Sequence, residues 1–546
     1  MAKVVHELAE TLAGLGHRTA FGLLGSGNFK LAQHLVDGCG GKLVWVRNES
    51  AAVAAADAYA QVTHGLGLAT VHQGPGVTNT LTPLAAAVRE GTPLLLLAGE
   101  TARGKRVSQT LDLAALAAAV GAGSELLRDG RTAAADIARA AERALRERRP
   151  IVVGLPIDLQ EEEAPASEAP PPASLNVPRA RPASADVAAV ADLLERCERP
   201  LILAGRGAVL AGAREPLEAL GDRIGALFAT SLVGNGLFAG NPRSLGVCGG
   251  FSSKLAERVV READLVLAFG AGLNEWTTMH RTLIANAAVV QVDDRAAAIG
   301  RHGPVRLGLV GDAAEAAQAL AEELERRGHH AAGWPLAEEV RGYDPAHDFE
   351  PVEADGLLDP RSLTVALDAA MPAERTVVYD GGHFHWFPTP FLSVPDADGF
   401  VPAQGFQAVG LGLGTAIGAA VARPDRPVLL LIGDGGTMMA LGELDSLIAQ
   451  RLRVLVAIYD DGAYGAEVHH FGPMGLPTEL VEFGERDFTA VARGLGAEAA
   501  AVRDTGEVTA AVERWLGGPG GPLVLDCKVN PAVVAERLAE AFKGGA

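Results

Sequence analysis

The fold of this chain is decided by the stretch Val428-Leu-Leu-Leu-Ile-Gly-Asp-Gly-Gly436 and by Asp460-Asp461-Gly462-Ala463 downstream of it. The apolar run predicts a buried strand that ends in a glycine turn, and residues 438–450 have helical spacing. A second apolar run, 454–459, follows at a distance that fits one helix and a return strand. A parallel return strand would bring the two acidic turns side by side. A hairpin turn, which Asp-Gly favours, is the simpler alternative.

Parallel strands share one carboxyl edge, and open α/β sheets bind ligands there. In the turn Gly433-Asp434-Gly435-Gly436, the glycines would let backbone N–H groups approach a phosphate at a helix N-terminus. Asp434 and Asp461, with a backbone carbonyl near Ala463, offer the oxygen ligands that Mg²⁺ prefers. The alternative to this metal site is a pair of solvated acidic turns.

Length and composition bound the class of protein. A chain of 546 residues is too long for one core and predicts about three domains. Hydrophobic residues make up 48% and charged residues 21%, which is typical of a folded globular protein. The net charge of −20 argues against binding to nucleic acid or to an acidic membrane, and no apolar run is long enough to span a bilayer. Four cysteines without a CxxC pair and an amphipathic N-terminus favour a cytoplasmic protein.

The order of elements predicts an α/β fold with three doubly wound parallel-sheet domains, at 1–160, 184–335 and 356–546. A Pro-rich linker, 161–183, separates the first two, and a loop-like stretch, 333–355, leads into the third. The similar rhythm of the first and third blocks suggests duplicated domains. The expected strands are 19–24, 43–47, 67–71, 93–98, 151–155, 200–204, 265–269, 289–292, 376–379, 427–432, 454–459 and 522–526.

A carboxylate also follows a predicted strand in the first block. Residues 44–49 read Val-Trp-Val-Arg-Asn-Glu, so Glu49 would begin the alanine-rich helix at 50–62. Gln73-Gly74-Pro75-Gly76-Val77-Thr78-Asn79 predicts a turn after the next strand. The helix dipole alone favours a glutamate at a helix start, and a Gly-Pro-Gly turn needs no ligand. Each motif by itself is therefore weak evidence for a ligand-binding site.

Together and in this order, the motifs resemble those of thiamine diphosphate (ThDP) enzymes of the acetolactate synthase-like superfamily. That group includes acetolactate synthase, benzoylformate decarboxylase, benzaldehyde lyase and pyruvate oxidase, and the resemblance covers nearly the whole chain. It implies a pyrimidine-binding, a middle and a diphosphate-binding domain, with ThDP and Mg²⁺ bound between the subunits of a homodimer or homotetramer. FAD remains an open question, because Gly205-Arg206-Gly207-Ala208 lacks the third glycine of a dinucleotide fingerprint.

The resemblance assigns roles to residues of this chain. Glu49 would hydrogen-bond the aminopyrimidine ring and promote loss of the thiazolium C2 proton, which creates the ylid and calls for a dry pocket. The cofactor contacts would be Gly74, Pro75, Gly76, Asn79, Gly382, His383, Val409, Gly433, Asp434, Gly435, Gly436, Asp461, Ala463 and Tyr464. Val409 would be the pivot between the two rings, and Asp434, Asp461 and Ala463 would bind the metal. The candidate substrate contacts are Ser26, Gln109, His385, Glu467, His469 and His470.

Simpler interpretations stand beside several of these roles. Gln109 fits a helix cap, Val409 fits ordinary core packing, and the segment of Glu467 fits a solvent-facing lid. The pair His383 and His385 has the spacing of metal ligands, but no third ligand is near in the sequence.

Three departures from the family bear on the reaction. Asp461 replaces the usual asparagine ligand, Val409 is smaller than the usual pivot, and Ala466, His469 and His470 stand where acetolactate synthases carry a methionine and a Gln-Trp pair. The residues at these last three positions weaken the case for true acetolactate synthesis. They favour a polar or anionic substrate.

The resemblance implies ThDP- and Mg²⁺-dependent decarboxylation of a 2-oxo acid with ligation of the enamine to an acceptor. A simple 2-oxo acid decarboxylase or a hydroxyketone lyase is the alternative. A flavin-dependent oxidase of the same fold is a third possibility, and a non-catalytic ThDP-binding paralogue is the alternative of another class.

Overall fold

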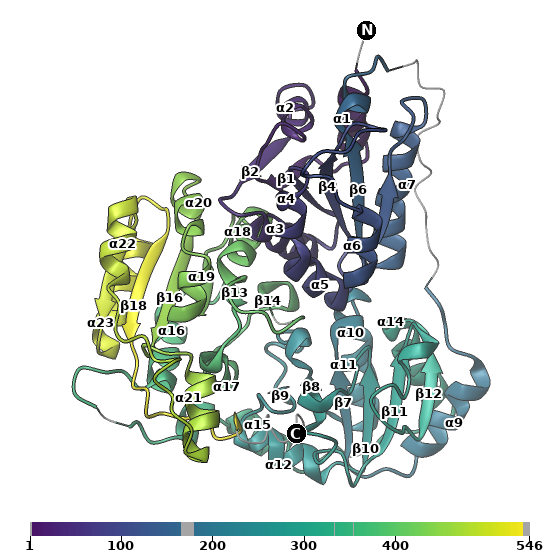
Figure 1. The fold of residues 1–546 in the computed structure, drawn as a ribbon. Helices are drawn as coiled ribbons and strands as arrows, with labels where there is room; N and C mark the ends of the chain where they lie inside the picture. The colour runs from purple at the N-terminus through teal and green to yellow at the C-terminus, as the bar shows by residue number, and fades with distance from the viewer. Residues whose placement is uncertain (1–2, 165–178, 332, 353, 404, 539–546) are drawn as a thin grey trace.

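The computed structural model describes residues 3–164, 179–331, 333–352, 354–403 and 405–538, in which the chain forms three six-stranded sheets (Figure 1). The neighbouring strands within each sheet are parallel, from the β1·β2 pair to the β17·β18 pair. The predicted α/β class with three parallel sheets is therefore confirmed. Most of the expected linker, 165–178, lies outside the described residues.

The first sheet has the strand order β2-β1-β3-β4-β6-β5. Its strands are β1 (Thr19–Gly22), β2 (Lys42–Trp45), β3 (Gly67–Val71), β4 (Leu94–Glu100), β5 (Gly123–Leu126) and β6 (Pro150–Pro156). Its helices are α1 (Val4–Gly14), α2 (Phe29–Asp37), α3 (Glu49–Thr63), α4 (Pro75–Thr78), α5 (Leu81–Glu90), α6 (Leu113–Val120), α7 (Ala133–Glu147) and α8 (Ile157–Gln160). Every residue of β3 and β6 is buried, as expected of inner parallel strands covered on both faces.

The third sheet has the order β14-β13-β15-β16-β18-β17, which repeats that of the first sheet strand for strand. Its strands are β13 (Thr376–Tyr379), β14 (Phe400–Pro402), β15 (Val428–Gly433), β16 (Val454–Asp460), β17 (Glu498–Val502) and β18 (Leu523–Lys528). Its helices are α16 (Pro360–Ala370), η4 (His383–Trp386), α17 (Pro388–Phe391), η5 (Ala397–Gly399), α18 (Gly412–Ala422), α19 (Asp434–Met439), α20 (Glu443–Ala449), α21 (Gly465–Phe471), η6 (Gly472–Met474), α22 (Phe488–Leu495) and α23 (Thr505–Leu516). The winding of the first sheet reverses between β1 and β3, and that of the third sheet reverses between β13 and β15. Open α/β sheets bind ligands at such switch points.

The middle sheet has the different order β12-β11-β10-β7-β8-β9. Its strands are β7 (Pro200–Ala204), β8 (Leu227–Thr230), β9 (Ser244–Val247), β10 (Leu265–Phe269), β11 (Ala288–Asp293) and β12 (Leu307–Val310). The helices of this part are α9 (Ser184–Leu194), α10 (Arg206–Leu210), α11 (Arg214–Ile224), η1 (Leu232–Gly234), α12 (Lys254–Glu262), α13 (Glu275–Thr278), η2 (Ala296–Ala298), α14 (Ala313–Arg326), α15 (Ala337–Gly342) and η3 (Pro345–Asp348). The Arg206 guanidinium lies 2.8 Å from the Glu90 carboxylate, which ties this sheet to the first.

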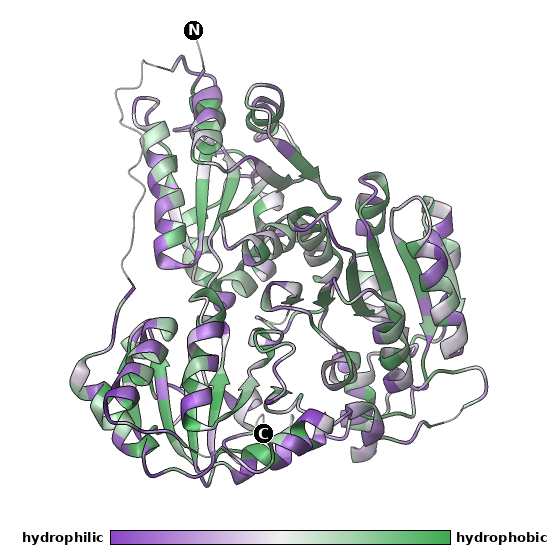
Figure 2. Cartoon of the chain, turned by 180° about the vertical axis from the view of Figure 1, so that it is seen from behind, coloured by the Kyte–Doolittle hydropathy of each residue, from purple (hydrophilic) through white to green (hydrophobic). Residues whose placement is uncertain are grey.

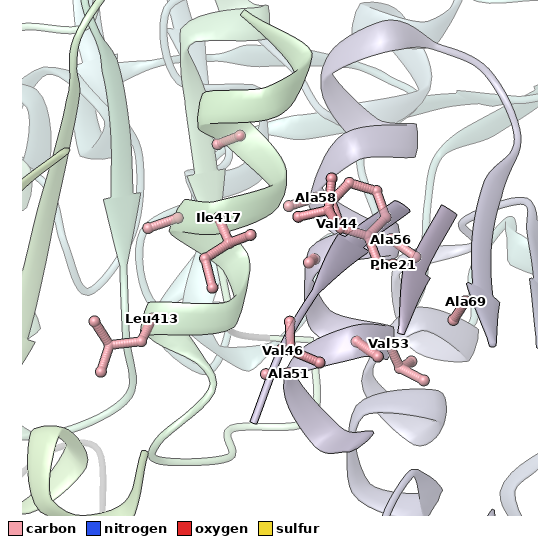
Figure 3. Packing of buried hydrophobic residues seen from close by; sticks show 14 of the residues in the cluster. Phe21, Val44, Val46, Ala51, Val53, Ala56, Ala58, Ala69, Leu413 and Ile417 are labelled. Carbon is pink, nitrogen blue, oxygen red and sulfur yellow. The ribbon is translucent and has the colours of Figure 1, made fainter. Parts of the chain in front are cut away.

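Helix α3 of the first domain packs along α18 of the third (Figure 3). A Cβ atom at Gly418 would lie 2.0 Å from the Ala55 carbonyl oxygen, and one at Gly414 would lie 2.9 Å from the Ala51 Cα, so glycine permits the close approach. Because Gly414 lies against Ala51 and Gly418 against Ala55, the two helices run in the same direction and begin at the same end. The carboxyl edges of the first and third sheets therefore open side by side on one face of the chain.

Two expectations about the connections are wrong. The helix expected at 438–450 is two helices, α19 and α20, which break at Gly442 because glycine is a poor helix former. The loop-like stretch 333–355 contains α15 and η3, and Trp334 is buried against the middle domain.

Six strands were not expected from the sequence: β5, β8, β9, β12, β14 and β17. All but β8 lie at the edge of a sheet, and most of these edge strands are partly exposed, so they lack a long apolar run. The flank of the linker also differs from expectation. Residues 161–163 pack on the first domain, where Glu161 pairs with Lys3 and Lys30.

The hydropathy of the chain agrees with this layering. Figure 2 shows hydrophobic strands inside each layer and hydrophilic residues on the outward faces of the covering helices. Among the described residues, no helix combines the length and the apolar character needed to cross a bilayer.

Candidate active site

The carboxyl edge of the third sheet brings the two acidic turns together, as predicted from their spacing. Asp434 is the first residue of α19, directly after β15, and its Oδ2 accepts a hydrogen bond of 3.0 Å from the Gly462 N–H beyond β16. A Cβ atom at Gly435 would lie 2.5 Å from the Tyr464 ring, and one at Gly436 would lie 2.3 Å from Asp380 Oδ2. Glycine is therefore required for the close packing around this turn.

Asp434 and Asp461, the two carboxylates at this edge, have no ion-pair partner among the residues that the structure describes. Burial, and then the nearby Asp461 and Asp460, raise the pKa of Asp434 to about 8; burial also raises the pKa of Asp461 to about 6. Within the described part of the chain, no arginine, lysine or histidine forms an ion pair with Asp434 or Asp461, whereas Asp460 pairs with Lys528. A buried carboxylate, Asp434, next to a partly buried one, Asp461, forms an arrangement that a bound cation would stabilise.

The buried carboxylate of Asp380, at the end of β13, holds the loop that carries Val409. It accepts hydrogen bonds from the backbone N–H groups of Gly410, Leu411 and Gly412, at 2.9 to 3.1 Å. Burial raises the pKa of Asp380 to about 6, against the opposing effect of these donors. Val409 lies against Gly436 and the loop of Gly381, and its side chain is 37% exposed at the sheet edge. Asp380 was not among the predicted residues, although an acid between a strand and Gly381-Gly382 is a usable signal.

In the first domain, Glu49 is the first residue of α3 and faces the Gly-Pro-Gly turn. Its Oε2 accepts a 2.9 Å hydrogen bond from the Asn79 side chain, and a Cβ atom at Gly76 would lie 3.3 Å from its Oε1. Glu49 is partly exposed in the single chain, so the dry pocket expected for it is not formed by this chain alone.

Gln109 and Ser26 lie near the same turn. A Cβ atom at Gly74 would contact Gln109 at 2.9 Å, and the Gln109 side chain accepts a 2.8 Å hydrogen bond from Gln73. Ser26 is exposed in the loop after β1.

His72 is a residue of this site that the sequence interpretation missed. Its Nδ1 accepts a 3.0 Å hydrogen bond from the Gly27 N–H, and its Cβ would lie 3.6 Å from a Cβ atom at Gly76. It therefore lies between the Ser26 loop and Glu49. The sequence feature that could have indicated His72 is its position directly after the buried strand β3.

The histidines of the third domain separate into two groups. The rings of His383 and His469 lie 4.6 Å apart, and burial lowers the pKa of both, to about 3 for His383. A Cβ atom at Gly465 would lie 2.6 Å from Asp461 Oδ2 and 3.2 Å from His383 Nδ1, so His383 is next to the acidic turn. His385 instead packs against Phe251 of the middle domain and Trp386, with ring centroids 5.1 and 5.6 Å away.

The remaining predicted contacts lie around this edge. Glu467 is exposed on α21, and His470 packs edge-on against Phe471. Gly382 has φ of 137°, which glycine adopts readily and other residues rarely do. The Tyr464 ring covers Gly435 and meets Phe483 edge-on at 5.3 Å.

Glu443 joins the two halves of the site within the chain. This buried residue begins α20 and accepts hydrogen bonds from the backbone N–H groups of Arg47 (3.0 Å) and Asn48 (2.8 Å), directly before Glu49. Sequence interpretation missed Glu443, because its partners are almost 400 residues away in the chain. The start of α3 is thereby fixed to the third domain.

Comparison with known proteins shows the family of the chain. Models of thiamine pyrophosphate enzymes match the chain in three parts: the N-terminal TPP binding domain over residues 2–117, the central domain over 187–320 and the C-terminal TPP binding domain over 380–527. A putative acetolactate synthase large subunit from Mycobacterium tuberculosis is 30% identical over 90% of this chain and 92% of its own length. The chain belongs to the ThDP-dependent enzymes of the acetolactate synthase-like superfamily.

Other relatives carry more than one activity name. An acetolactate synthase large subunit from Parasynechococcus marenigrum is 28% identical over 91% of this chain and 83% of its own length. A sulfoacetaldehyde acetyltransferase from Alcaligenes xylosoxydans xylosoxydans is 26% identical over 93% of this chain and 89% of its own length. The enzyme is therefore similar, over 91–93% of its length, to ThDP enzymes that are named for different reactions.

The residues of this ThDP enzyme fit the diphosphate and a divalent cation. Asp434 and Asp461 supply hard oxygen donors without a counter-charge, and the Ala463 carbonyl lies in the same turn. No cluster of three or more histidine, cysteine, aspartate or glutamate residues suited to a metal is present among the described residues. Phosphate oxygens and the backbone would therefore have to complete the coordination of a cation here.

The glycine loop of the middle domain does not fit a flavin diphosphate. The Gly205 and Gly207 N–H groups donate to the backbone carbonyls of Phe269 and Gly270, at 2.9 and 3.0 Å. A Cβ atom at Gly270 would lie 2.4 Å from the Gly207 Cα, so the two loops meet at the switch point of this sheet. With Arg206 paired to Glu90, this loop has no free donor set for a phosphate.

Proposed function

We propose that this enzyme catalyses ThDP- and Mg²⁺-dependent decarboxylation of a 2-oxo acid and joins the resulting acyl unit to an acceptor carbonyl. When bound, ThDP supplies a nucleophilic carbon and a positively charged ring that accepts the electron pair left by loss of CO₂. The observation that carries the proposal is the Glu49 carboxylate, held by Asn79 on the same face as the uncompensated Asp434 and Asp461. A simple decarboxylase or a hydroxyketone lyase would use the same groups.

Each group has a proposed task. Glu49 would hold a proton at the pyrimidine ring, oriented by Asn79, beside the turn Gly74-Pro75-Gly76. Asp434, Asp461 and the Ala463 carbonyl would hold Mg²⁺, and Gly433, Gly435, Gly436 and Tyr464 would surround the diphosphate. Val409 would separate the two rings of the cofactor.

The substrate side would be lined by polar groups, with Glu467 as an exposed acid on α21. His383 and His469 are held neutral by burial, so they can orient a polar substrate through hydrogen bonds without adding charge. Gln109, Ser26 and His72 would approach from the first domain, and Glu467 and His470 from α21. His385 is left out of this set because it packs against the middle domain. The names of the relatives, an acetolactate synthase and a sulfoacetaldehyde acetyltransferase, support ligation to an acceptor.

Release of CO₂ from a panel of 2-oxo acids, with ThDP and Mg²⁺ present, tests the reaction. We expect release from at least one acid, and a ligation product when an acceptor aldehyde or 2-oxo acid is added. The product mixture separates the alternatives: a free aldehyde identifies a decarboxylase, and cleavage of a hydroxyketone identifies a lyase. A protein that binds ThDP but releases CO₂ from no acid and cleaves no hydroxyketone would contradict the proposal.

A second copy of the chain would complete each site. The carboxyl edges of the first and third sheets lie side by side and face the same way, so neither edge covers the other. Glu49 stays partly exposed, and apolar side chains at these edges, among them Val107, Leu111, Val409, Met438 and Met439, are 36–57% exposed. A two-fold related copy would place its Glu49 opposite Asp434 of this chain and cover these residues.

Mixed subunits test this arrangement. Glu49→Gln and Asp434→Asn are each expected to be inactive as pure proteins. If each site combines Glu49 of one copy with Asp434 of the other, a mixed dimer has one intact site of two, so the purified mixed dimer keeps about half of wild-type activity and a random mixture about a quarter. The measurement is activity after co-expression of differently tagged variants and purification of the mixed species. No recovery in a verified mixed dimer would mean that each site is built within one chain.

A further inference from the structure

Next to the metal turn lies a buried ion cluster formed by Asp460, Asp526 and Lys528. The Lys528 side chain is 5% exposed, and those of Asp460 and Asp526 are each 1% exposed. The Lys528 ammonium donates to Asp460 Oδ2, lies 3.1 Å from Asp526 Oδ2 and donates to the Arg486 carbonyl oxygen at 2.6 Å. Glu485 lies 3.5 Å away at the exposed side. A lysine this deeply buried needs such partners, and it gives Asp460 a counter-charge that Asp434 and Asp461 lack.

The cluster is connected directly to the backbone that presents the metal ligands. Asp460 Oδ1 accepts a 3.2 Å hydrogen bond from the Gly462 N–H, the same group that donates to Asp434. The Gly462 carbonyl in turn accepts from the N–H groups of Phe483 and Gly484, each at 2.9 Å. Lys528 thus connects the end of β16, the segment 483–486 and β18 around the turn that carries Asp461 and Ala463.

We propose that Lys528 is a positioning residue for the metal site, one that holds the Asp460–Ala463 turn in place and keeps the Asp460 carboxylate from acting as a metal ligand. The inference rests on the proposed role of Asp434 and Asp461 as the ligands of Mg²⁺. Both carboxylate oxygens of Asp460 are engaged, Oδ2 by Lys528 and Oδ1 by Gly462. Asp460 ends β16 directly before Asp461, and these contacts hold its carboxylate in the ion cluster.

Removal of the lysine should harm Mg²⁺ binding in particular. Mg²⁺ demands nearly ideal octahedral positions, whereas Ca²⁺ accepts six to eight oxygens in flexible arrangements. Without Lys528, Asp460 is a free carboxylate beside the site and its link to the Arg486 carbonyl is lost, while the hydrogen bonds of the Gly462 carbonyl to Phe483 and Gly484 remain. A displaced turn with one more carboxylate suits Ca²⁺ better than Mg²⁺.

The test measures ThDP binding by calorimetry in the presence of Mg²⁺ or Ca²⁺, without turnover. We expect Lys528→Met to weaken the Mg²⁺-dependent affinity about 10- to 100-fold and the Ca²⁺-dependent affinity much less, as for other residues that orient metal ligands. The double variant Lys528→Met/Asp460→Asn removes the freed carboxylate, and its Mg²⁺-dependent affinity should return to within about threefold of the wild type. Lys528→Arg, which keeps the charge, should be affected less than Lys528→Met.

If Lys528→Met fails to fold, the single variant Asp460→Asn still tests the proposal. Because Asp460 is not a ligand in this arrangement, the single variant should bind Mg²⁺ and ThDP within about threefold of the wild type. A tenfold loss in Asp460→Asn, or unchanged Mg²⁺-dependent binding in a folded Lys528→Met, would overturn the role of Lys528. If the wild-type protein binds no ThDP with Mg²⁺, the metal site itself is refuted, which is a separate result.

Discussion

Replacing Glu49 with glutamine is expected to lower turnover by about 10²- to 10⁴-fold while ThDP remains bound. Glutamine has the same shape and can still contact Asn79, but it cannot hold and release a proton at the pyrimidine ring. Exchange of the thiazolium C2 proton for deuterium, followed by NMR, should slow by a similar factor. Calorimetry should show ThDP affinity close to that of the wild type, because the proposed diphosphate anchor lies in the other domain.

The control for this variant addresses the simpler interpretation of Glu49 as a favourable acid at a helix start. Asp186 is an exposed acid in the first turn of α9 in the middle domain, so Asp186→Asn makes the matching change from acid to amide. It should alter neither exchange nor turnover. Fast C2 exchange in Glu49→Gln with ThDP bound would remove Glu49 from the mechanism and leave only the dipole effect.

Local patterns predicted the parts of the site that lie at strand ends. The adjacency of Asp434 and Asp461 followed from two apolar runs with room between them for a helix, because neighbouring parallel strands end at one edge. The placement of Glu49 before an alanine-rich helix followed from the same rule. For such residues, periodicity and strand direction contain the required information.

Residues whose role depends on a distant partner were not predictable in this way. Glu443 binds backbone groups before Glu49, and Lys528 neutralises Asp460 from another strand; neither has a local motif. His383 and His385 show that closeness in the sequence does not predict whether two side chains point to the same site. They lie two positions apart in a 3₁₀ helix, whose three residues per turn direct such side chains to different sides, so one contacts His469 and the other Phe251.

Replacing Asp434 with asparagine is expected to weaken Mg²⁺-dependent ThDP binding by about 100-fold, which is on the order of 2.7 kcal/mol. Asparagine can still accept the hydrogen bond from Gly462, so the turn should stay in place while one anionic ligand is lost. Titration of ThDP at fixed Mg²⁺ measures the loss. Asp186→Asn again serves as the control, and binding of wild-type affinity by Asp434→Asn would exclude Asp434 as a ligand.

In the metal-free protein, Asp434→Asn is expected to raise the folding stability, although the same substitution weakens Mg²⁺-dependent ThDP binding. The pKa of Asp434 is raised in the folded state, so the folded protein binds a proton that the unfolded chain releases near pH 4. This group therefore costs stability progressively as the pH rises from about 4 to about 8. Asparagine removes that cost, and metal-free Asp434→Asn should melt at a higher temperature than the metal-free wild type at pH 8, with little difference at pH 4.

Addition of Mg²⁺ and ThDP should stabilise the wild type and leave the variant almost unchanged, because only the wild type gains a counter-charge for its carboxylate at position 434. A variant that melts lower at pH 8 without metal would mean that Asp434 stabilises the fold itself and not a bound cation.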